Sequence, residues 1–150
     1  MRCGNPCGHA WHCLRQPRAH GASGVPRIIA QLVASAIVAE VTIVEEYALP
    51  DRGYFRARLN LSNRDFLEVA EYFVVESGYC ITQRYRYQWM DEQQGVLKKR
   101  WDNVEHFPDL PNFPYHVHIG AEEHVESGQS MSIIELIALI EQEQGRSDLA

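Results

Sequence analysis

Strict alternation of apolar and polar side chains constrains the fold of this chain more than any other feature. It is clearest in residues 80–90, where aromatic and hydrophilic side chains take turns. The aromatic set is Tyr85, Tyr87 and Trp89, and the hydrophilic set is Arg84, Arg86 and Gln88. A period of two puts neighbouring side chains on opposite faces of an extended strand. The pattern therefore predicts a sheet with one apolar face and one polar face.

The rest of the chain supplies further strands and a helix at each end. Strands are predicted in residues 41–49, 54–60, 66–75, 96–101 and 116–119. Pro26 and the apolar spacing after it predict a helix over residues 26–39. A capping box from Ser132 to Glu135 starts a second helix. We expect an α+β fold: a single antiparallel sheet of about five or six strands, with an N-terminal and a C-terminal helix packed on one face.

These elements are expected to form one domain, which spans residues 26–145. Residues 146–150 are predicted to be a frayed tail. Residues 1–25 are predicted to be a disordered basic leader, which the native product would lack if translation started at a later codon. Cysteines and histidines in this leader have the residue types of zinc ligands, but their spacing is too tight to enclose a core. No metal site is therefore predicted there.

The distribution of charge limits the partners of the chain. The formal net charge is −6, and the first 28 residues hold four arginines and no acid, so the remaining residues carry −10. An acidic body argues against non-specific binding to long nucleic acid as the main activity. The sequence has no apolar run that could span a bilayer and no hydrophobic signal segment. We therefore expect a cytoplasmic protein that does not bind membranes.

A loop with prolines at positions 108, 111 and 114 precedes two histidines, His116 and His118. Proline fixes φ and lacks an amide donor, so neither a helix nor a central strand is expected across this loop. The short strand that follows places both imidazoles on one face. A rigid loop that ends in paired histidines is well suited to an active site.

Basic side chains are predicted to gather on the polar face of the sheet. They are Arg56, Arg58, Arg84 and Arg86, with Lys99 as a further candidate. A basic stripe on an acidic protein suits the binding of phosphate groups. The alternative is a solvated face on which the arginines pair with Glu68 and Glu71 of a neighbouring strand.

Several of these residues belong to an ordered set of motifs. The set consists of Tyr85-x-Tyr87, Arg100-Trp101-Asp102-Asn103, His106, Phe113-Pro114-Tyr115-His116-Val117-His118 and a C-terminal helix that begins at a serine. This order resembles the TumE-like toxin family of bacterial toxin–antitoxin systems, over roughly residues 28–143. Tyr115 stands where that family often has the first histidine of a pair, and Trp101 where it usually has tyrosine. The resemblance implies a bacterial toxin that is neutralised by a cognate DNA-binding antitoxin.

The leading hypothesis for the chemistry is a metal-independent ribonuclease without a cofactor. Attack by the 2′-hydroxyl of RNA needs a base, an acid and cations on the phosphate, and imidazoles suit both proton roles. The predicted catalytic residues are His106, His116, His118, Asp102 and Glu68, the carboxylates serving to orient an imidazole. The predicted residues for binding RNA or phosphate are Arg84, Arg86, Arg100, Tyr85 and Tyr87. The two tyrosines would stack on a base, or else belong to the core.

Two other readings stay open from the sequence. The three histidines and Asp102 have the ligand types of a divalent transition metal, which would make the protein a metal-dependent hydrolase. Alternatively, the protein is not an enzyme and blocks a cellular target. Open edges of an antiparallel sheet are also compatible with a homodimer or with a toxin–antitoxin complex.

Overall fold

The structure of the chain, a computed structural model, describes residues 24–149. The elements in chain order are α1 (Gly24–Ala34), β1 (Val38–Ala48), β2 (Arg52–Leu61), β3 (Phe66–Glu76), β4 (Tyr79–Met90), β5 (Leu97–Asp102), β6 (His116–Ile119), β7 (Val125–Ser127) and α2 (Ile133–Asp148). The predicted leader lies outside the described residues except for positions 24 and 25, which begin α1.

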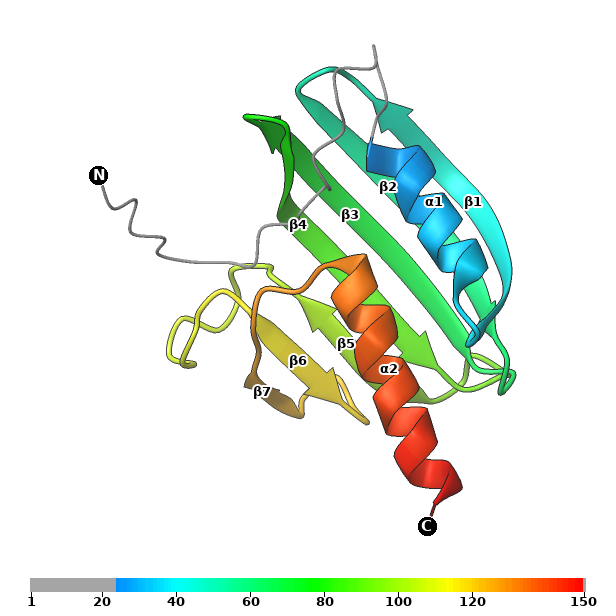
Figure 1. The fold of residues 1–150 in the computed structure, drawn as a ribbon. Coiled ribbons are helices and arrows are strands. Elements are labelled where there is room, and N and C mark those ends of the chain that lie inside the picture. Colours follow the sequence, from blue (N-terminus) through cyan, green and yellow to red (C-terminus); the bar gives the residue numbers. More distant parts are fainter. Residues whose placement is uncertain (1–23, 150) are drawn as a thin grey trace.

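All strands join one antiparallel sheet, in which each strand pairs with its neighbours in the sequence. The sheet has seven strands in the order β1-β2-β3-β4-β5-β6-β7. Short turns connect most of the strands, whereas residues 103–115 form a long connection between β5 and β6 (Figure 1). The prediction of one antiparallel sheet in an α+β fold is confirmed, with seven strands instead of five or six.

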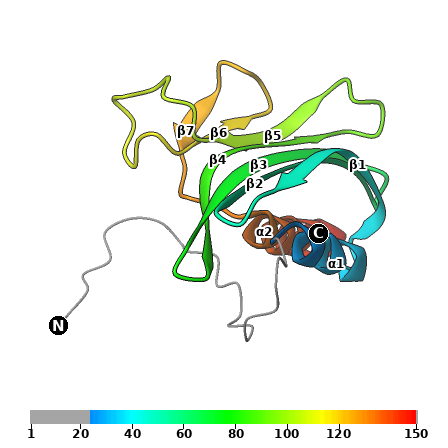
Figure 2. The same cartoon turned by 90° about the horizontal axis from the view of Figure 1, so that it is seen from above.

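Both helices cover the same face of the sheet, which we call the helix face. Helix α1 lies over β1 and β2, and α2 crosses the middle strands (Figures 1 and 2). One row of buried side chains runs across five strands of this face: Ala57, Val69, Tyr87, Trp101 and Val117. The polar side chains point to the other face, which no helix of the described chain covers and which we call the open face (Figure 2). The alternation in the sequence thus predicted both faces correctly.

The first helix is shorter than predicted, because residues 38 and 39, which were predicted to end it, belong to the first strand. Helix α1 ends at Ala34, and β1 begins at Val38, which pairs with Leu61. The Ser62 amide donates a hydrogen bond to the carbonyl of Ile37 at 2.8 Å, and this contact fixes the start of the β1–β2 pairing. The prediction of a helix through residue 39 is therefore wrong at its C-terminal end.

The second helix starts as the sequence predicts. Ser132 is its N-cap and forms the expected capping box with Glu135. The hydroxyls of Tyr85 and Tyr87 donate hydrogen bonds to the carbonyls of Gln129 and Met131, so two tyrosines of β4 hold the segment that leads into α2. The helix continues to Asp148, so most of the tail that was expected to fray is helical. None of the described helices is long and apolar enough to cross a membrane.

Lys99 is a second correction to the sequence analysis. It lies in β5 with its side chain on the helix face, where it forms an ion pair with Glu143 of α2. Lys99 therefore fastens the second helix to the sheet and does not join the arginines of the open face.

Candidate functional site

Two neighbouring rows of the open face carry half of the site residues that were predicted from the sequence. Strands β4, β5 and β6 contribute one residue each to both rows. The first row is Arg86, Asp102 and His116, and the second is Gln88, Arg100 and His118. The antiparallel register therefore brings the Arg-Trp-Asp-Asn motif beside the paired histidines, although a loop of 13 residues, 103–115, separates them in the chain.

Asp102 and His116 are in direct contact at the centre of this cluster. His116 Nε2 lies 2.9 Å from Asp102 Oδ1, and both side chains are almost completely buried. The other ring nitrogen, His116 Nδ1, lies 2.9 Å from the carbonyl oxygen of Pro114. A carbonyl and a carboxylate only accept hydrogen bonds, so both contacts are satisfied together only when the ring carries two protons. The geometry thus favours a protonated His116 held by Asp102.

His118 lies beside this pair and differs from it in one respect. Its Nδ1 is 2.7 Å from the carbonyl oxygen of Glu122, which requires a proton on Nδ1. Its Nε2 lies 3.9 Å from Asp102 Oδ2, beyond hydrogen-bond distance. In the neutral ring this Nε2 keeps its lone pair and points toward the same carboxylate. The two imidazole rings are 5.1 Å apart between centroids. The two histidines therefore differ in their contacts: His116 has a hydrogen-bond acceptor at each ring nitrogen, and His118 has one only at Nδ1.

Arg100 contacts the carboxylate of Asp102, and its guanidinium is already paired with Glu122. Its guanidinium forms a two-pronged ion pair with Glu122, and its Nε lies 3.4 Å from Asp102 Oδ2. The hydrogen bond from Arg100 holds the pKa of Glu122 below its usual value. Arg100 is 9% exposed. The structure thus places it where it positions Asp102 and Glu122, with little of its surface open to a substrate phosphate.

The proline-containing loop covers the histidines with an aromatic ring. Phe107 makes edge contacts with His116 and His118, at centroid distances of 4.9 and 5.8 Å. His106 contacts the same phenylalanine at 6.3 Å, but its side chain is exposed and does not join the cluster. Figure 2 shows the loop on the side of the sheet away from both helices. Phe107 was not singled out in the sequence, and a single aromatic residue before the first proline of the loop carries no pattern that could have identified it.

Asn103 explains the amide at the end of the Arg-Trp-Asp-Asn motif. It follows the last residue of β5, and its side chain continues the pairing with β4. Its Oδ1 accepts a hydrogen bond from the Tyr85 amide at 3.0 Å, and its Nδ2 donates one to the Gln83 carbonyl at 2.8 Å. The side chain thus stands in for one more residue of strand and fixes where the chain leaves the sheet beside Asp102.

Replacing Asn103 by alanine is expected to destabilise the protein by about 1–3 kcal/mol, because it leaves a strand amide and a strand carbonyl without their partners. Urea unfolding followed by circular dichroism measures the change. Asn60→Ala is a matched control, since Asn60 is exposed and its side chain makes a single hydrogen bond, to Glu40. Equal stability of the two variants would contradict the role given to Asn103.

Gly128 is required beside His116. A Cβ atom at position 128 would lie 2.9–3.0 Å from backbone atoms of His116, closer than side chains approach backbone in real proteins. The Gly128 amide also donates a hydrogen bond to the carbonyl of Tyr115 at 3.0 Å. The glycine therefore lets the segment before α2 pack directly against the strand that carries both histidines.

Three of the predicted site residues lie elsewhere. Tyr85 and Tyr87 are buried on the helix face, 4% and 0% exposed, and their hydroxyls bind backbone carbonyls. Neither ring is presented to the open face, so neither stacks on a base there. Glu68 lies on the open face in β3, and β4 separates it from β5, which carries Asp102. Its carboxylate forms ion pairs with Arg56 at 3.1 Å and with Arg58 at 3.0 Å. Partial burial acts to raise the pKa of Glu68, but these two arginines outweigh it and lower the pKa.

Arg84 and Arg86 are the basic residues that remain available on the open face near the site. Both are exposed. In the described part of the chain Arg84 makes no ion pair, and Arg86 contacts only the amide oxygen of Gln88 at 3.2 Å. Arg86 is the direct neighbour of Asp102 across β4 and β5. These two guanidinium groups can therefore bind a phosphate group without breaking an existing ion pair.

The same cluster has the donor types of a metal centre. Asp102, His116 and His118 each offer one ligand atom, and these atoms lie within 4.8 Å of one another. Each histidine turns its Nδ1 toward a backbone carbonyl, which is the orientation that metal-binding histidines usually have. Two features weigh against a cation: the direct contact between His116 and Asp102, and the positive charge of Arg100 on the same carboxylate. His106 is not part of this group.

Tyr115 stands where the TumE-like family often has a histidine, but its side chain lies outside the cluster around Asp102. Its ring stacks near Tyr85, with centroids 6.5 Å apart, on the side of the sheet opposite to His116. The two histidines that the structure brings to Asp102 are thus both present in this chain.

Comparison with known proteins gives one match. A family model described as Toxin TumE matches residues 27–145. No curated protein and no solved structure matches the chain. The matched residues include most of both helices, the whole sheet and every residue of the cluster around Asp102.

Proposed function

The chain belongs to the toxin TumE family, and on this premise we propose that it is a toxin that cuts RNA at the cluster of Asp102, His116 and His118. The observation that carries the proposal is the pair of unlike imidazoles at one carboxylate. His116 has both ring nitrogens next to acceptors, whereas His118 has an acceptor within hydrogen-bond distance only at Nδ1, which leaves its Nε2 to serve as the base. Cleavage of RNA by its own 2′-hydroxyl needs such a pair of acid and base.

In the proposed reaction His118 Nε2 takes the proton of the 2′-hydroxyl while O2′ attacks the phosphorus atom. The bond between phosphorus and O5′ breaks, and His116 Nε2 gives its proton to the leaving oxygen. The products are a 2′,3′-cyclic phosphate and a 5′-hydroxyl, so no further reactant is needed. Asp102 keeps His116 protonated and oriented, and Arg100 holds Asp102 in place.

The phosphate would be bound by arginines that have no competing carboxylate. Arg86 lies next to Asp102 in the register, and Arg84 follows two residues away on the same face of β4. Charge-assisted hydrogen bonds from guanidinium groups stabilise the extra negative charge of the transition state. Because Phe107 covers both imidazoles, the substrate reaches them only when this part of the loop moves aside.

A metal-dependent hydrolase is the second candidate, and one observation favours it. Both histidines present Nε2 to Asp102 while Nδ1 is held by a carbonyl, as in the coordination of zinc or manganese. A bound ion would polarise the phosphate and supply the nucleophile from water. Metal analysis of the purified protein, together with His118→Ala, separates this candidate from the first.

The proposed partners follow from the family. A bacterial toxin that acts on cellular RNA needs a cognate antitoxin in the cytoplasm, and we propose that such a protein binds this chain. The exposed outer edge of β1 offers backbone groups to a partner strand or to a second copy of the chain.

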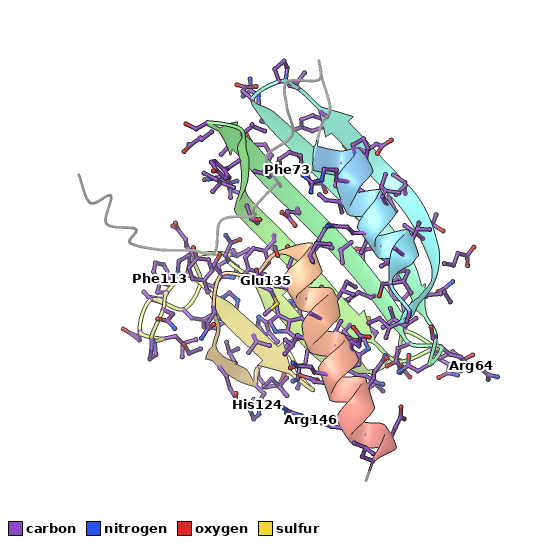
Figure 3. All side chains as sticks on the ribbon, in the orientation of Figure 1. Arg64, Phe73, Phe113, His124, Glu135 and Arg146 are labelled. Atoms are coloured by element: carbon purple, nitrogen blue, oxygen red, sulfur yellow. The ribbon has the colours of Figure 1, made fainter. Side chains whose placement is uncertain are left out.

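Induced expression of the full chain in a bacterial host tests the proposed function. Growth and the integrity of total RNA are followed together for the wild type, for His116→Ala and for His124→Ala. His124 is a matched control because it lies exposed between β6 and β7 (Figure 3) and is not part of the cluster around Asp102. We expect growth arrest with fragmented RNA for the wild type and the control only. Arrest with intact RNA would contradict a ribonuclease.

A further inference from the structure

A cavity opens on the open face beside the cluster of Asp102, His116 and His118. Its volume is about 680 Å³. Strands β2, β3 and β4 form its base, and residues 103–105, 114 and 115 of the loop form one wall. It begins next to the catalytic carboxylate, because Val104 lines it and the Val104 amide donates to Asp102 Oδ1 at 3.1 Å.

The shape of the cavity follows from one small residue among large ones. Arg56, Ala70 and Arg86 form a row across β2, β3 and β4, and Tyr54, Tyr72 and Arg84 form the next row. Ala70 leaves a hollow between two long side chains, and the hollow is continued by the rings of Tyr54 and Tyr72. Because the alternation is regular here, all six side chains leave the sheet on the same side as His116 and His118.

We propose that this cavity binds one unpaired nucleotide of the RNA substrate, next to the phosphate that is cut. The inference rests on the proposed function for its substrate. The volume falls in the range of pockets that enclose small ligands. Tyr72 and Tyr54 offer flat aromatic surfaces to a base, and Arg84 and Arg86 offer positive charge to its phosphate.

The position of Arg86 links the cavity to the reaction. Arg86 lines the cavity and is also the register partner of Asp102, so one guanidinium borders both places. A nucleotide whose base lies over Ala70 and Tyr72 would put its phosphate near Arg86. A base inside a duplex is stacked and paired and cannot enter such a hollow. The cavity therefore selects single-stranded RNA.

Binding of a short RNA that cannot be cut tests the inference. The full chain is titrated with a fluorescent single-stranded oligonucleotide that carries 2′-O-methyl groups, and anisotropy is measured at constant salt. Ala70→Leu fills the hollow and is expected to weaken binding at least about 10-fold. Tyr72→Ala removes a stacking surface and is expected to weaken it roughly 5- to 150-fold. Either variant alone decides the question if the other fails to fold.

Matched controls lie on the helix side of the molecule. Ala138→Leu adds the same atoms to an exposed position of α2. Arg84→Ala and Arg146→Ala each remove one positive charge, but Arg146 lies near the C-terminal end of α2 (Figure 3). We expect Ala138→Leu to leave affinity unchanged and Arg146→Ala to change it less than Arg84→Ala.

The two proposals fail in different ways. If Ala70→Leu and Tyr72→Ala bind the oligonucleotide as the wild type does, the cavity is not the nucleotide site, even if unmodified RNA is cut. If the oligonucleotide binds with the expected pattern but unmodified RNA is never cut, the proposed function is wrong and the nucleotide site remains. Equal binding of a duplex with the same 2′-O-methyl groups overturns the selection of single strands.

Discussion

Asp102→Asn is expected to lower the rate of RNA cleavage by roughly 100- to 10,000-fold, the usual contribution of a positioned acid or base. The variant keeps the shape of the side chain and changes its hydrogen bonding. The carboxylate oxygen 2.9 Å from His116 Nε2 accepts a hydrogen bond from the ring, whereas an amide nitrogen at that place would donate a hydrogen bond to it. The ring would then keep its proton on Nδ1, next to the Pro114 carbonyl, and Nε2 would have no proton for the leaving oxygen.

The measurement is the single-turnover rate with a labelled single-stranded RNA and purified full chain. Asp109→Asn is the matched control, because Asp109 is an exposed carboxylate in the loop that follows β5. Circular dichroism shows whether each variant is folded. A folded Asp102→Asn protein that cuts RNA at the rate of the wild type would remove Asp102 from the mechanism.

The largest expected effect on stability comes from a buried carboxyl on the helix face. Glu71 is 1% exposed, and its carboxyl oxygens are hydrogen-bonded to the hydroxyls of Thr82 and Tyr87, both at 2.7 Å. Burial raises its pKa from 4.5 to about 7, although hydrogen bonds from Thr82, Tyr87 and the Ile133 backbone act in the opposite direction. Between these two pH values the folded protein keeps a proton that the unfolded chain releases. The free energy of unfolding should therefore fall as the pH rises from about 4.5 to 7, by roughly 3 kcal/mol, and the fall should end above pH 7.

Urea unfolding at several pH values between 4.5 and 8 measures this effect. Glu71→Gln cannot ionise, so this part of the pH dependence should disappear in the variant. Other groups titrate equally in both proteins, and the difference between the two curves isolates Glu71. Glu46→Gln is a control at an exposed position of β1. If the wild type and Glu71→Gln depend on pH in the same way, the pKa of Glu71 in the folded protein is not raised above its value in the unfolded chain.

The arrangement of the fold was largely predictable, because local pattern decides it here. Alternation in residues 80–90 assigned the faces of β4 correctly, and the capping box located the start of α2. The end of α1 was not predictable in this way. The apolar spacing of a helix continues as far as Ile37. The helix nevertheless ends at Ala34, because Val38 pairs with Leu61 and starts β1. A contact between residues far apart in the sequence thus overrides the helical pattern.

The types of residue in the site could be predicted from the sequence, but only some of the residues that form it could be identified. The strand pattern placed His116 and His118 on one face, but it could not reveal that Asp102 is the register partner of His116. Glu122 and Phe107 lie in loops, where the sequence shows neither the period of a helix nor that of a strand. Their contacts with the site arise from the tertiary fold. Arg100 could not be recognised as occupied because its partner lies 22 positions later in the chain. Ala70 has no reactive group at all, and only the large side chains around it make it significant.

The ends of the RNA fragments test the central claim most directly. Purified full chain is incubated with a labelled single-stranded RNA in the presence of EDTA, and the 3′ ends of the fragments are identified by mass spectrometry. An acid–base mechanism at His116 and His118 predicts cleavage under these conditions, with 2′,3′-cyclic phosphate ends. Intact RNA with EDTA that is cut when zinc or manganese is restored, or fragments with 3′-hydroxyl ends, would contradict it and favour metal-dependent hydrolysis at the same three residues.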